Sequence, residues 1–151
     1  MIIEFAKMCP GAMSPDRGHP SDAGLDVYAH MPEQKSVVIG PNENMVIPTG
    51  LRFAIPHGYM LQICNRSSMG AKKSLVVGAH IIDSGYDGEV FIDLHNIGSM
   101  PQRVTHYDKI AQIVMVPVVS FHPREVAPAH LYQLPITISD RGAGALGSTD
   151  R

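Results

Sequence analysis

The chain has 151 residues, with 12 Lys or Arg against 14 Asp or Glu, a formal net charge of -2 and a pI near 6.4. This length fits one domain with a real core, and the charge argues against a global basic field for nucleic acid or an acidic membrane. No apolar run approaches the roughly 18 residues that span a bilayer. Cys9 and Cys64 show no paired spacing, and the N-terminus does not resemble a signal peptide. We therefore expect a reduced, cytoplasmic protein, or one of the host cytoplasm or nucleus if a virus encodes it.

Short runs of β-favouring residues recur along the chain, separated by Pro, Gly, Asn and Asp. Many short strands at close spacing are typical of a β-sandwich or barrel. The expected strands cover residues 2–6, 37–39, 45–47, 51–55, 59–64, 90–94 and 110–119. The one expected helix covers residues 67–74, with a serine cap. The sequence therefore predicts a single all-β domain.

Residues 78–89 concentrate three glycines, Asp83 and Tyr86 between two apolar runs at 75–77 and 90–92. Glycine adopts backbone conformations that other residues avoid, so the segment is typical of a β-hairpin with a shaped tip. Asp83 lies where a carboxylate can be held rigidly, with Tyr86 three residues later. Two interpretations stay open on this segment alone: a tight hairpin whose Asp and Gly serve only the turns, or part of a site.

Polar side chains also gather in three other parts of the chain. Residues 65–70 end a strand and begin the expected helix, so Arg66 and two serine hydroxyls would face one anion; the alternative is a capped helix with an incidental Arg. Gln112 is a lone polar residue in an apolar strand, either a satisfied core amide or a site residue. The glycine-rich tail at 139–151 fits a frayed terminus or a phosphate clamp built on Arg141.

Five segments, taken in order, resemble the motifs of the homotrimeric deoxyuridine triphosphatase (dUTPase) family. Each motif is weak alone, but five in order from Ala23 to Thr149 are highly specific. The segments are residues 23–27, 66–68, 82–89, 108–112 and 141–149. The resemblance implies a jelly-roll β-barrel or sandwich over residues 1–138, with a short helix. Residues 139–151 would be a flexible C-terminal arm closing over a neighbouring subunit's site.

The resemblance also implies a function. The enzyme would hydrolyse dUTP to dUMP and pyrophosphate by attack of water on the α-phosphorus, keeping uracil out of DNA and supplying dUMP for thymidylate synthesis. Asp83 would orient and deprotonate the water, and Asp26 would support the site. Base and sugar would contact Gly78, Ala79, His80, Ile81, Ile82, Tyr86, Phe91 and Leu146. The phosphates would contact Arg66, Ser67, Ser68, Gln112, Arg141, Gly147, Ser148 and Thr149.

The implied assembly and cofactor follow from the same resemblance. In such proteins three subunits share three active sites. Each site contains the first, second and fourth motifs of one subunit, the third motif of a second subunit and the fifth motif of the third subunit. Mg²⁺ would be held by the substrate phosphates and water, with no direct protein ligand. No nucleic acid or membrane partner is expected.

Three departures from the family pattern keep alternatives open. Leu146 stands where an aromatic residue usually stacks over the base, and Asn65 replaces a proline. The pair at 79–80 also resembles the related deoxycytidine triphosphate (dCTP) deaminases, in which a glutamate and an arginine occupy the positions of Asp93 and Ala71. Asp93 is either a base with a shorter arm or an outward-facing strand residue, whereas Ala71 cannot replace a cation. A dCTP deaminase, a bifunctional dCTP deaminase/dUTPase and a dUTPase-like regulatory binding module are therefore the alternatives.

Overall fold

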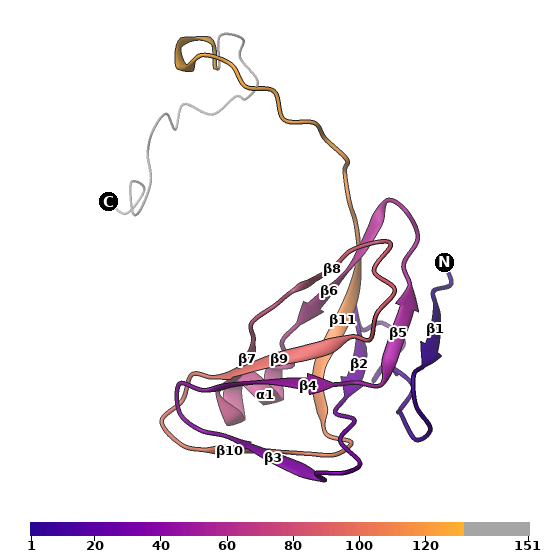
Figure 1. The fold of residues 1–151 in the computed structure, drawn as a ribbon, viewed down its shortest axis with the longest axis vertical. Helices are drawn as coiled ribbons and strands as arrows, with labels where there is room; N and C mark the ends of the chain where they lie inside the picture. The colour runs from indigo at the N-terminus through magenta and orange to yellow at the C-terminus, as the bar shows by residue number, and fades with distance from the viewer. Residues whose placement is uncertain (132–151) are drawn as a thin grey trace. The chain divides into compact units, whose positions relative to one another are not determined.

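The computed structural model describes residues 1–131, which contain strands β1 to β11, one α-helix and one 3₁₀ helix (Figure 1). Their bounds are β1 (Glu4–Lys7), β2 (Leu25–Tyr28), β3 (Ser36–Ile39), β4 (Asn44–Pro48), β5 (Leu51–Ala54), β6 (Tyr59–Cys64), α1 (Ser67–Lys73), β7 (Leu75–Val77), β8 (Ile81–Ile82), β9 (Phe91–Asn96), β10 (Gln102–Thr105), β11 (Lys109–Pro117) and η1 (Pro128–His130). Residues 1–120 form one compact unit, and a second unit begins at Phe121. Within the described part of the chain, no helix has the length and apolar character to cross a membrane.

The first unit is a β-sandwich. One sheet has the strand order β2-β11-β6-β8 and the other has the order β4-β9-β7, while β1 pairs with β5 and β3 with β10. All of these pairs are antiparallel, and most join strands that are distant in sequence. Packed antiparallel sheets whose paired strands are distant in sequence are typical of a jelly roll. The predicted all-β architecture with one short helix is confirmed, with the strands in separate sheets rather than one closed barrel.

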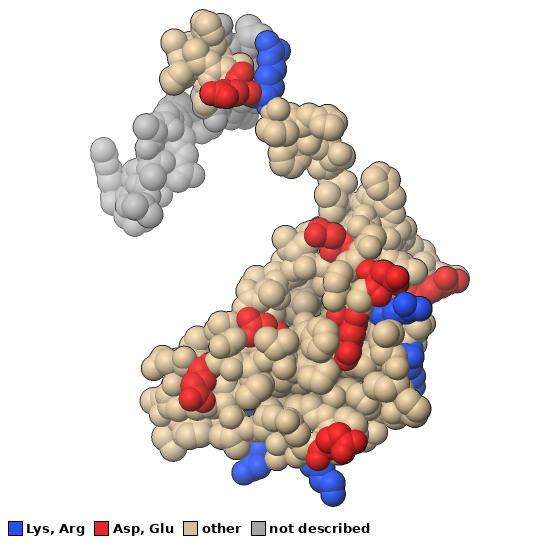
Figure 2. Space-filling view, in the orientation of Figure 1, with Lys and Arg blue, Asp and Glu red and all other residues tan. Residues whose placement is uncertain are grey.

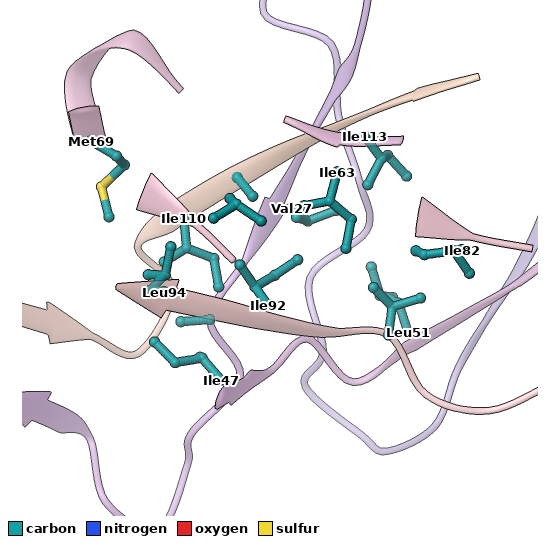
Figure 3. Packing of buried hydrophobic residues seen from close by; sticks show 14 of the residues in the cluster. Val27, Ile47, Leu51, Ile63, Met69, Ile82, Ile92, Leu94, Ile110 and Ile113 are labelled. Carbon is teal, nitrogen blue, oxygen red and sulfur yellow. The ribbon is translucent and has the colours of Figure 1, made fainter. Parts of the chain in front are cut away.

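Apolar side chains of the two larger sheets face one another across the core (Figure 3). On β9, Ile92 and Leu94 are fully buried, while the residues between and beside them are half-buried or exposed. Val27 of β2 and Ile110 of β11 are equally buried on the opposite side. Full burial of one such side chain contributes about 1.5–3 kcal/mol. Because a slip of one residue would turn Asp93 into the core, this alternation also fixes the register of β9.

Charged side chains are sparse on the face of the protein that Figure 2 shows. On the face shown in Figure 2, acidic and basic side chains are scattered among larger areas that carry neither. A net charge of -2 over 151 residues accords with this distribution. The described surface in this view therefore offers no broad field of one sign that would steer a polyanion.

The strand predictions differ from the structure mainly at their ends. The expected strand at 59–64 coincides with β6, and the one expected at 110–119 runs from Lys109 to Pro117. Strand β10 was not predicted, because its sequence Gln-Arg-Val-Thr contains a single apolar residue. The predicted serine cap is wrong: the N-cap of α1 is Arg66, which makes no side-chain cap hydrogen bond.

The segment between β7 and β9 is more than a hairpin tip. Strands β7 and β9 pair antiparallel, with Val77 opposite Leu94, so the predicted hairpin is confirmed. Their connection carries β8, which pairs with β6 and places Ile82 opposite Leu61 in the other sheet. The connection at 78–90 therefore crosses from one sheet to the other, and this crossing presents Asp83 at the surface.

Candidate functional site

The site residues expected from the sequence lie around two separate cavities in the described part of the chain. We call the first the polar pocket; its volume is about 300 Å³, and it is lined by Gly18, His19, Asp22, Asp26, Arg66, Ser67, Lys109 and Gln112. We call the second the hairpin pocket; its volume is about 230 Å³, and it is lined by Ile63, Ala79, Ile81, Ile82, Asp83, Tyr86, Glu89, Val90 and Phe91.

Three neighbouring strands bring the polar pocket together. In the β2-β11-β6 part of the sheet, Gln112 of β11 lies opposite Asp26 of β2 on one side and Cys64 of β6 on the other. Arg66 lies two residues after the end of β6 and is the N-cap of α1. Residues that are far apart in sequence therefore lie close together where these three strands are paired.

Arg66 is held in a fixed orientation. Its Nε donates a 2.7 Å hydrogen bond to Oδ1 of Asp26, and its Nη1 lies 3.3 Å from the carbonyl oxygen of Lys109 and 3.4 Å from Oγ of Ser68. The ammonium of Lys109 lies 3.0 Å from the other carboxylate oxygen of Asp26. The hydrogen bond with Asp26 raises the pKa of Lys109 above its usual value. A guanidinium fixed in this way presents a preorganised cation to an anion in the pocket.

Gln112 borders the polar pocket and is also tied to the backbone. Its Nε2 donates a 2.9 Å hydrogen bond to the carbonyl oxygen of Asn65. A Cβ on Gly24 would lie 3.1 Å from Oε1 of Gln112 and 2.9 Å from the carbonyl oxygen of Ile113. Glycine at position 24 therefore lets β2 approach Gln112 closely. Gln112 thus lines the polar pocket with its amide oriented by the backbone, and its role as a site residue stays a prediction.

The hairpin pocket combines one exposed carboxylate with apolar surface. The hydroxyl of Tyr86 donates a 2.8 Å hydrogen bond to the carbonyl oxygen of Glu89, and the Glu89 carboxylate accepts one of 2.7 Å from the backbone N–H of Gly50. These bonds fix the Tyr86 ring close to Asp83, whose carbonyl oxygen accepts the Tyr86 N–H. Phe91 is 45% exposed and Ile81 is 61% exposed. Open apolar surface of this kind next to a carboxylate is suited to a flat ring with a polar edge.

Two of the predicted base-side residues within the described part of the chain, Gly78 and His80, do not line the hairpin pocket. Gly78 and His80 flank Ala79 and are exposed. The ring Nδ1 of His80 lies 3.1 Å from the carbonyl oxygen of Ile63, so His80 is bound to its own sheet. The predicted arm, with Arg141, Leu146, Gly147, Ser148 and Thr149, lies outside the described residues, and these positions stay predictions.

Asp93 is an outward-facing strand residue, as one of its two interpretations required. Its Oδ1 accepts a 2.9 Å hydrogen bond from the Asn44 amide, and its Oδ2 lies 2.9 Å from Nε2 of His95. Burial acts to raise the pKa of Asp93, but the hydrogen bonds with Asn44 and His95 lower it below its usual value. Both carboxylate oxygens are thus occupied, and the group is stabilised as an anion.

Sequence reasoning missed part of the polar network. Lys109 lies inside the fourth motif-like segment, so its position was a usable signal. Asp16 and Tyr28 lie outside all five segments, yet Oδ1 of Asp16 accepts a 2.8 Å hydrogen bond from the Tyr28 hydroxyl. Glu89 was also missed as the residue that anchors the hairpin to Gly50. Nothing in the sequence alone marked Asp16.

Comparison with known proteins gives a consistent result. The family model described as dUTPase matches residues 11–149. The chain is 37% identical over 131 residues to the deoxyuridine 5'-triphosphate nucleotidohydrolase of Roseobacter denitrificans, covering 84% of this chain and 80% of that one. It is similar to a dUTPase variant of Staphylococcus bacteriophage 80alpha solved with dUpNHpp, with a TM-score of 0.82, 25% identity and 98% of each chain covered. It is also similar to a variant of the dUTPase from phage phi11 of S. aureus, whose structure revealed the coordination of a structural Mg(II) ion; the TM-score is 0.75 and the identity 26%, over 83% of this chain and 97% of that one.

Proposed function

The chain belongs to the dUTPase family and is a dUTP diphosphatase, and we propose that Asp83 directs the attack of water on the α-phosphorus of dUTP. The observation that carries this assignment is the placement of Asp83 beside the fixed ring of Tyr86 in an open apolar pocket. Within residues 1–131 the Asp83 carboxylate forms no side-chain hydrogen bond and is exposed. It is therefore free to accept a proton from a bound water.

The proposed reaction is a simple hydrolysis. The water oxygen bonds to the α-phosphorus while the bond from that phosphorus to the bridging oxygen breaks, which releases pyrophosphate and leaves dUMP. Asp83 takes the proton of the attacking water. Because phosphoryl transfer depends mainly on positioning and charge neutralisation, the chain needs one base and a set of donors, both of which are present around the two pockets.

The hairpin pocket is the proposed site for the nucleoside. The Tyr86 ring would pack under the deoxyribose and leave no room for a 2′-hydroxyl, and its hydroxyl bond to Glu89 supports a fixed ring position. The backbone at 78–82 would read the pyrimidine edge, with Ala79 and Phe91 lining the pocket. Ring and backbone positions of this kind select by shape and hydrogen bonding together.

The polar pocket is the proposed site for the triphosphate. Arg66, Ser67 and Gln112 line it, and Ser68 lies against the guanidinium of Arg66. Asp26 would support the site by orienting Arg66 rather than by touching phosphate, since both of its oxygens are occupied by Arg66 and Lys109. In the tail, Arg141, Gly147, Ser148 and Thr149 would clamp the terminal phosphate, and Leu146 would cover the base.

A homotrimer with shared active sites is the proposed assembly. Support comes from the separation of the hairpin pocket and the polar pocket, because one nucleotide needs both kinds of surface. Exposed apolar residues on and beside the hairpin pocket, such as Tyr86 and Phe91, are suited to contact with a second subunit. The polar pocket of one subunit would then face the hairpin pocket of another, with the arm of the third closing over both.

Mg²⁺ is the proposed cofactor, carried by the substrate. Within residues 1–131, no three His, Cys, Asp or Glu side chains are grouped to hold a metal. Asp26 is fully engaged and Asp22 is the other carboxylate at the polar pocket, so this donor set fits an ion held by phosphate oxygens and water. When bound, Mg²⁺ neutralises phosphate charge in the reaction. Asp22 would accept hydrogen bonds from its water ligands.

Product analysis tests the proposed function. Purified protein is given dUTP or dCTP in parallel, and pyrophosphate and ammonia are both measured. We expect pyrophosphate from dUTP, little from dCTP, and no ammonia from either. Ammonia release from dCTP would identify a deaminase instead. A folded oligomer that turns over neither nucleotide but binds dUTP would identify a regulatory binding module.

A further inference from the structure

Asp16 lies in the loop before β2 and is tied to the polar pocket in two ways. Its backbone forms an isolated bridge with Asp26, with hydrogen bonds of 3.2 Å and 2.7 Å between their N–H and carbonyl groups. Its carboxylate accepts a hydrogen bond from Tyr28, and Nζ of Lys109 lies 3.1 Å from Oδ1 and 3.2 Å from Oδ2. Asp16 therefore contacts both β2 and β11.

The Asp16–Lys109 contact is the first of three successive ion pairs. Asp16 binds Lys109, Lys109 binds Asp26, and Asp26 binds Arg66, with successive distances of 3.1, 3.0 and 2.7 Å. Two carboxylates and two cations sum to no net charge. In such a series each group is oriented by its neighbours, so that removal of an end member frees the next one. Arg66 is the member that lines the polar pocket.

The directions of the pKa shifts of Asp16 and Tyr28 agree with a charged Asp16–Lys109 pair. Burial acts to raise the pKa of Asp16, but the hydrogen bonds from Tyr28 and Lys109 lower it below its usual value. Burial and the hydrogen bond to Asp16 raise the pKa of Tyr28. At neutral pH, Asp16 and Lys109 are therefore an ion pair, and Tyr28 is a neutral donor to it.

We propose that Asp16 is a positioning residue for the triphosphate, acting through Lys109 and Asp26 to fix the guanidinium of Arg66 at the polar pocket. The inference rests on the proposed function of this pocket as the phosphate site. Within residues 1–131, Nε and Nη1 of Arg66 bond to protein atoms, which leaves Nη2 for an anion. If Asp16 is lost, the Lys109 ammonium keeps only Asp26 among its carboxylate partners, and Arg66 shares that partner with a less constrained cation.

The substitution Asp16→Asn separates this role from simple electrostatics. It removes one negative charge close to the pocket, so charge alone would tighten the binding of an anion. Loss of positioning acts in the opposite direction. We therefore expect the affinity for pyrophosphate, measured by calorimetry with Mg²⁺, to fall about tenfold, which is the scale of one charge-assisted hydrogen bond. The affinity for deoxyuridine, which has no phosphate, should stay unchanged.

Kinetics and matched variants complete the test. We expect the KM for dUTP to rise by the same factor as the pyrophosphate dissociation constant, with a smaller fall in kcat, and Asp16→Glu to restore part of the loss. Glu4→Gln on β1 removes one negative charge from an exposed strand and should change the affinity for neither pyrophosphate nor deoxyuridine. In a Lys109→Met background, Asp16→Asn should have no further effect, because its route to Arg66 is already broken.

Three results would overturn the proposal: unchanged or tighter pyrophosphate binding by Asp16→Asn, an equal loss of deoxyuridine binding, or additive effects with Lys109→Met. If Asp16→Asn does not fold, Tyr28→Phe carries the test, because it removes one hydrogen bond to Asp16 and no charge. We expect Tyr28→Phe to weaken the binding of pyrophosphate but not of deoxyuridine. No change in pyrophosphate affinity would then reject the positioning role of Asp16. A wild-type protein that binds pyrophosphate but does not hydrolyse dUTP would contradict the proposed function and not this inference.

Discussion

The ring of His95 lies against the carboxylate of Asp93, with 2.9 Å between Nε2 and Oδ2 on the outer face of β9. Both side chains also border the backbone of Gly78, where the connection that carries Asp83 begins. A Cβ on Gly78 would lie 2.3 Å from Nε2 of His95 and 2.5 Å from Oδ2 of Asp93. The pair therefore acts as a support for the start of this connection.

Gly78→Ala should destabilise the protein and disturb the hairpin pocket. The added methyl group must displace the side-chain ends of His95 and Asp93, which breaks the hydrogen bond between them at a cost of about 1 kcal/mol. Urea unfolding measures this loss, and kcat/KM for dUTP should fall with it because residues 78–82 shift. Gly70→Ala is the matched control: a Cβ there meets nothing within 4 Å, and Ala favours a helix. Equal stability of the Gly78→Ala variant and wild type would show that the close contact is relieved without strain.

Asp93→Asn should leave dUTP hydrolysis close to the wild-type rate. The carboxylate is occupied by Asn44 and His95, so we give it a structural role and no part in proton transfer. Loss of its charge-assisted hydrogen bonds should lower the free energy of unfolding by about 1–3 kcal/mol. Steady-state assays with dUTP, together with unfolding curves, separate these effects. A collapse of kcat in a protein that remains folded would return Asp93 to the list of catalytic candidates.

Asp83→Asn should abolish turnover while nucleotide binding survives. Asparagine keeps the shape of the side chain but cannot accept the proton of the attacking water, and loss of a general base costs about 10²–10⁴-fold in rate. Pyrophosphate release gives kcat, and calorimetry with dUpNHpp gives affinity. Asp87→Asn is the control in the same connection, since the Asp87 side chain is 91% exposed and lies 3.3 Å from Arg52 in an ion pair; a surface pair of this kind contributes little. Retained activity in Asp83→Asn would end the assignment of Asp83 as base.

The sequence predicted those strands that have a clear run of apolar residues. The apolar run at 90–94 predicted a strand that the structure places at Phe91–Asn96, and the apolar run of β6 predicted that strand to the residue. Strand β10 escaped because only Val104 on it is buried, so its pairing with β3 decides its structure. Strand β8 escaped because its two residues become a strand only by pairing with β6.

The candidate site, like the fold, was predicted only in part from the sequence. Motif-like segments predicted Arg66 and Gln112, and the sheet brings both to the polar pocket. Asp16 contacts Tyr28, 12 residues away, and Lys109, 93 residues away, so no local pattern contains it. The division of predicted site residues between two cavities accords with the family resemblance, which assigns the third motif to a different subunit from the first, second and fourth. No local residue pattern shows this division, because it arises when distant strands are placed side by side.

Leu146→Phe should tighten substrate binding. This tail position lies outside the described residues, so the expectation rests on the sequence. Leucine covers a base by dispersion, whereas an aromatic ring adds stacking worth about 0.5–1.5 kcal/mol. The KM for dUTP and the dissociation constant of dUpNHpp should both fall, while Leu146→Met, which adds no ring, should change neither by much. No gain in affinity for the phenylalanine variant would show that this residue does not cover the base.

His30 should make the stability of the protein fall as the pH is lowered. Its ring is 7% exposed, its Nδ1 has no hydrogen-bond partner within the described residues, and the His106 ring lies 5.2 Å away. Burial, followed by the nearby His106, lowers the pKa of His30, although Glu89 acts in the opposite direction.

Because the folded-state pKa lies below the unfolded value of about 6.5, the unfolded chain binds this proton first. The free energy of unfolding should therefore decrease as the pH falls through about 6.5 and level off once the folded state is also protonated. Urea unfolding at a series of pH values measures the slope. His30→Gln should flatten it, whereas His57→Gln, in the exposed turn before β6, serves as the control for removing a surface histidine. An unchanged slope in His30→Gln would assign the pH dependence to other groups.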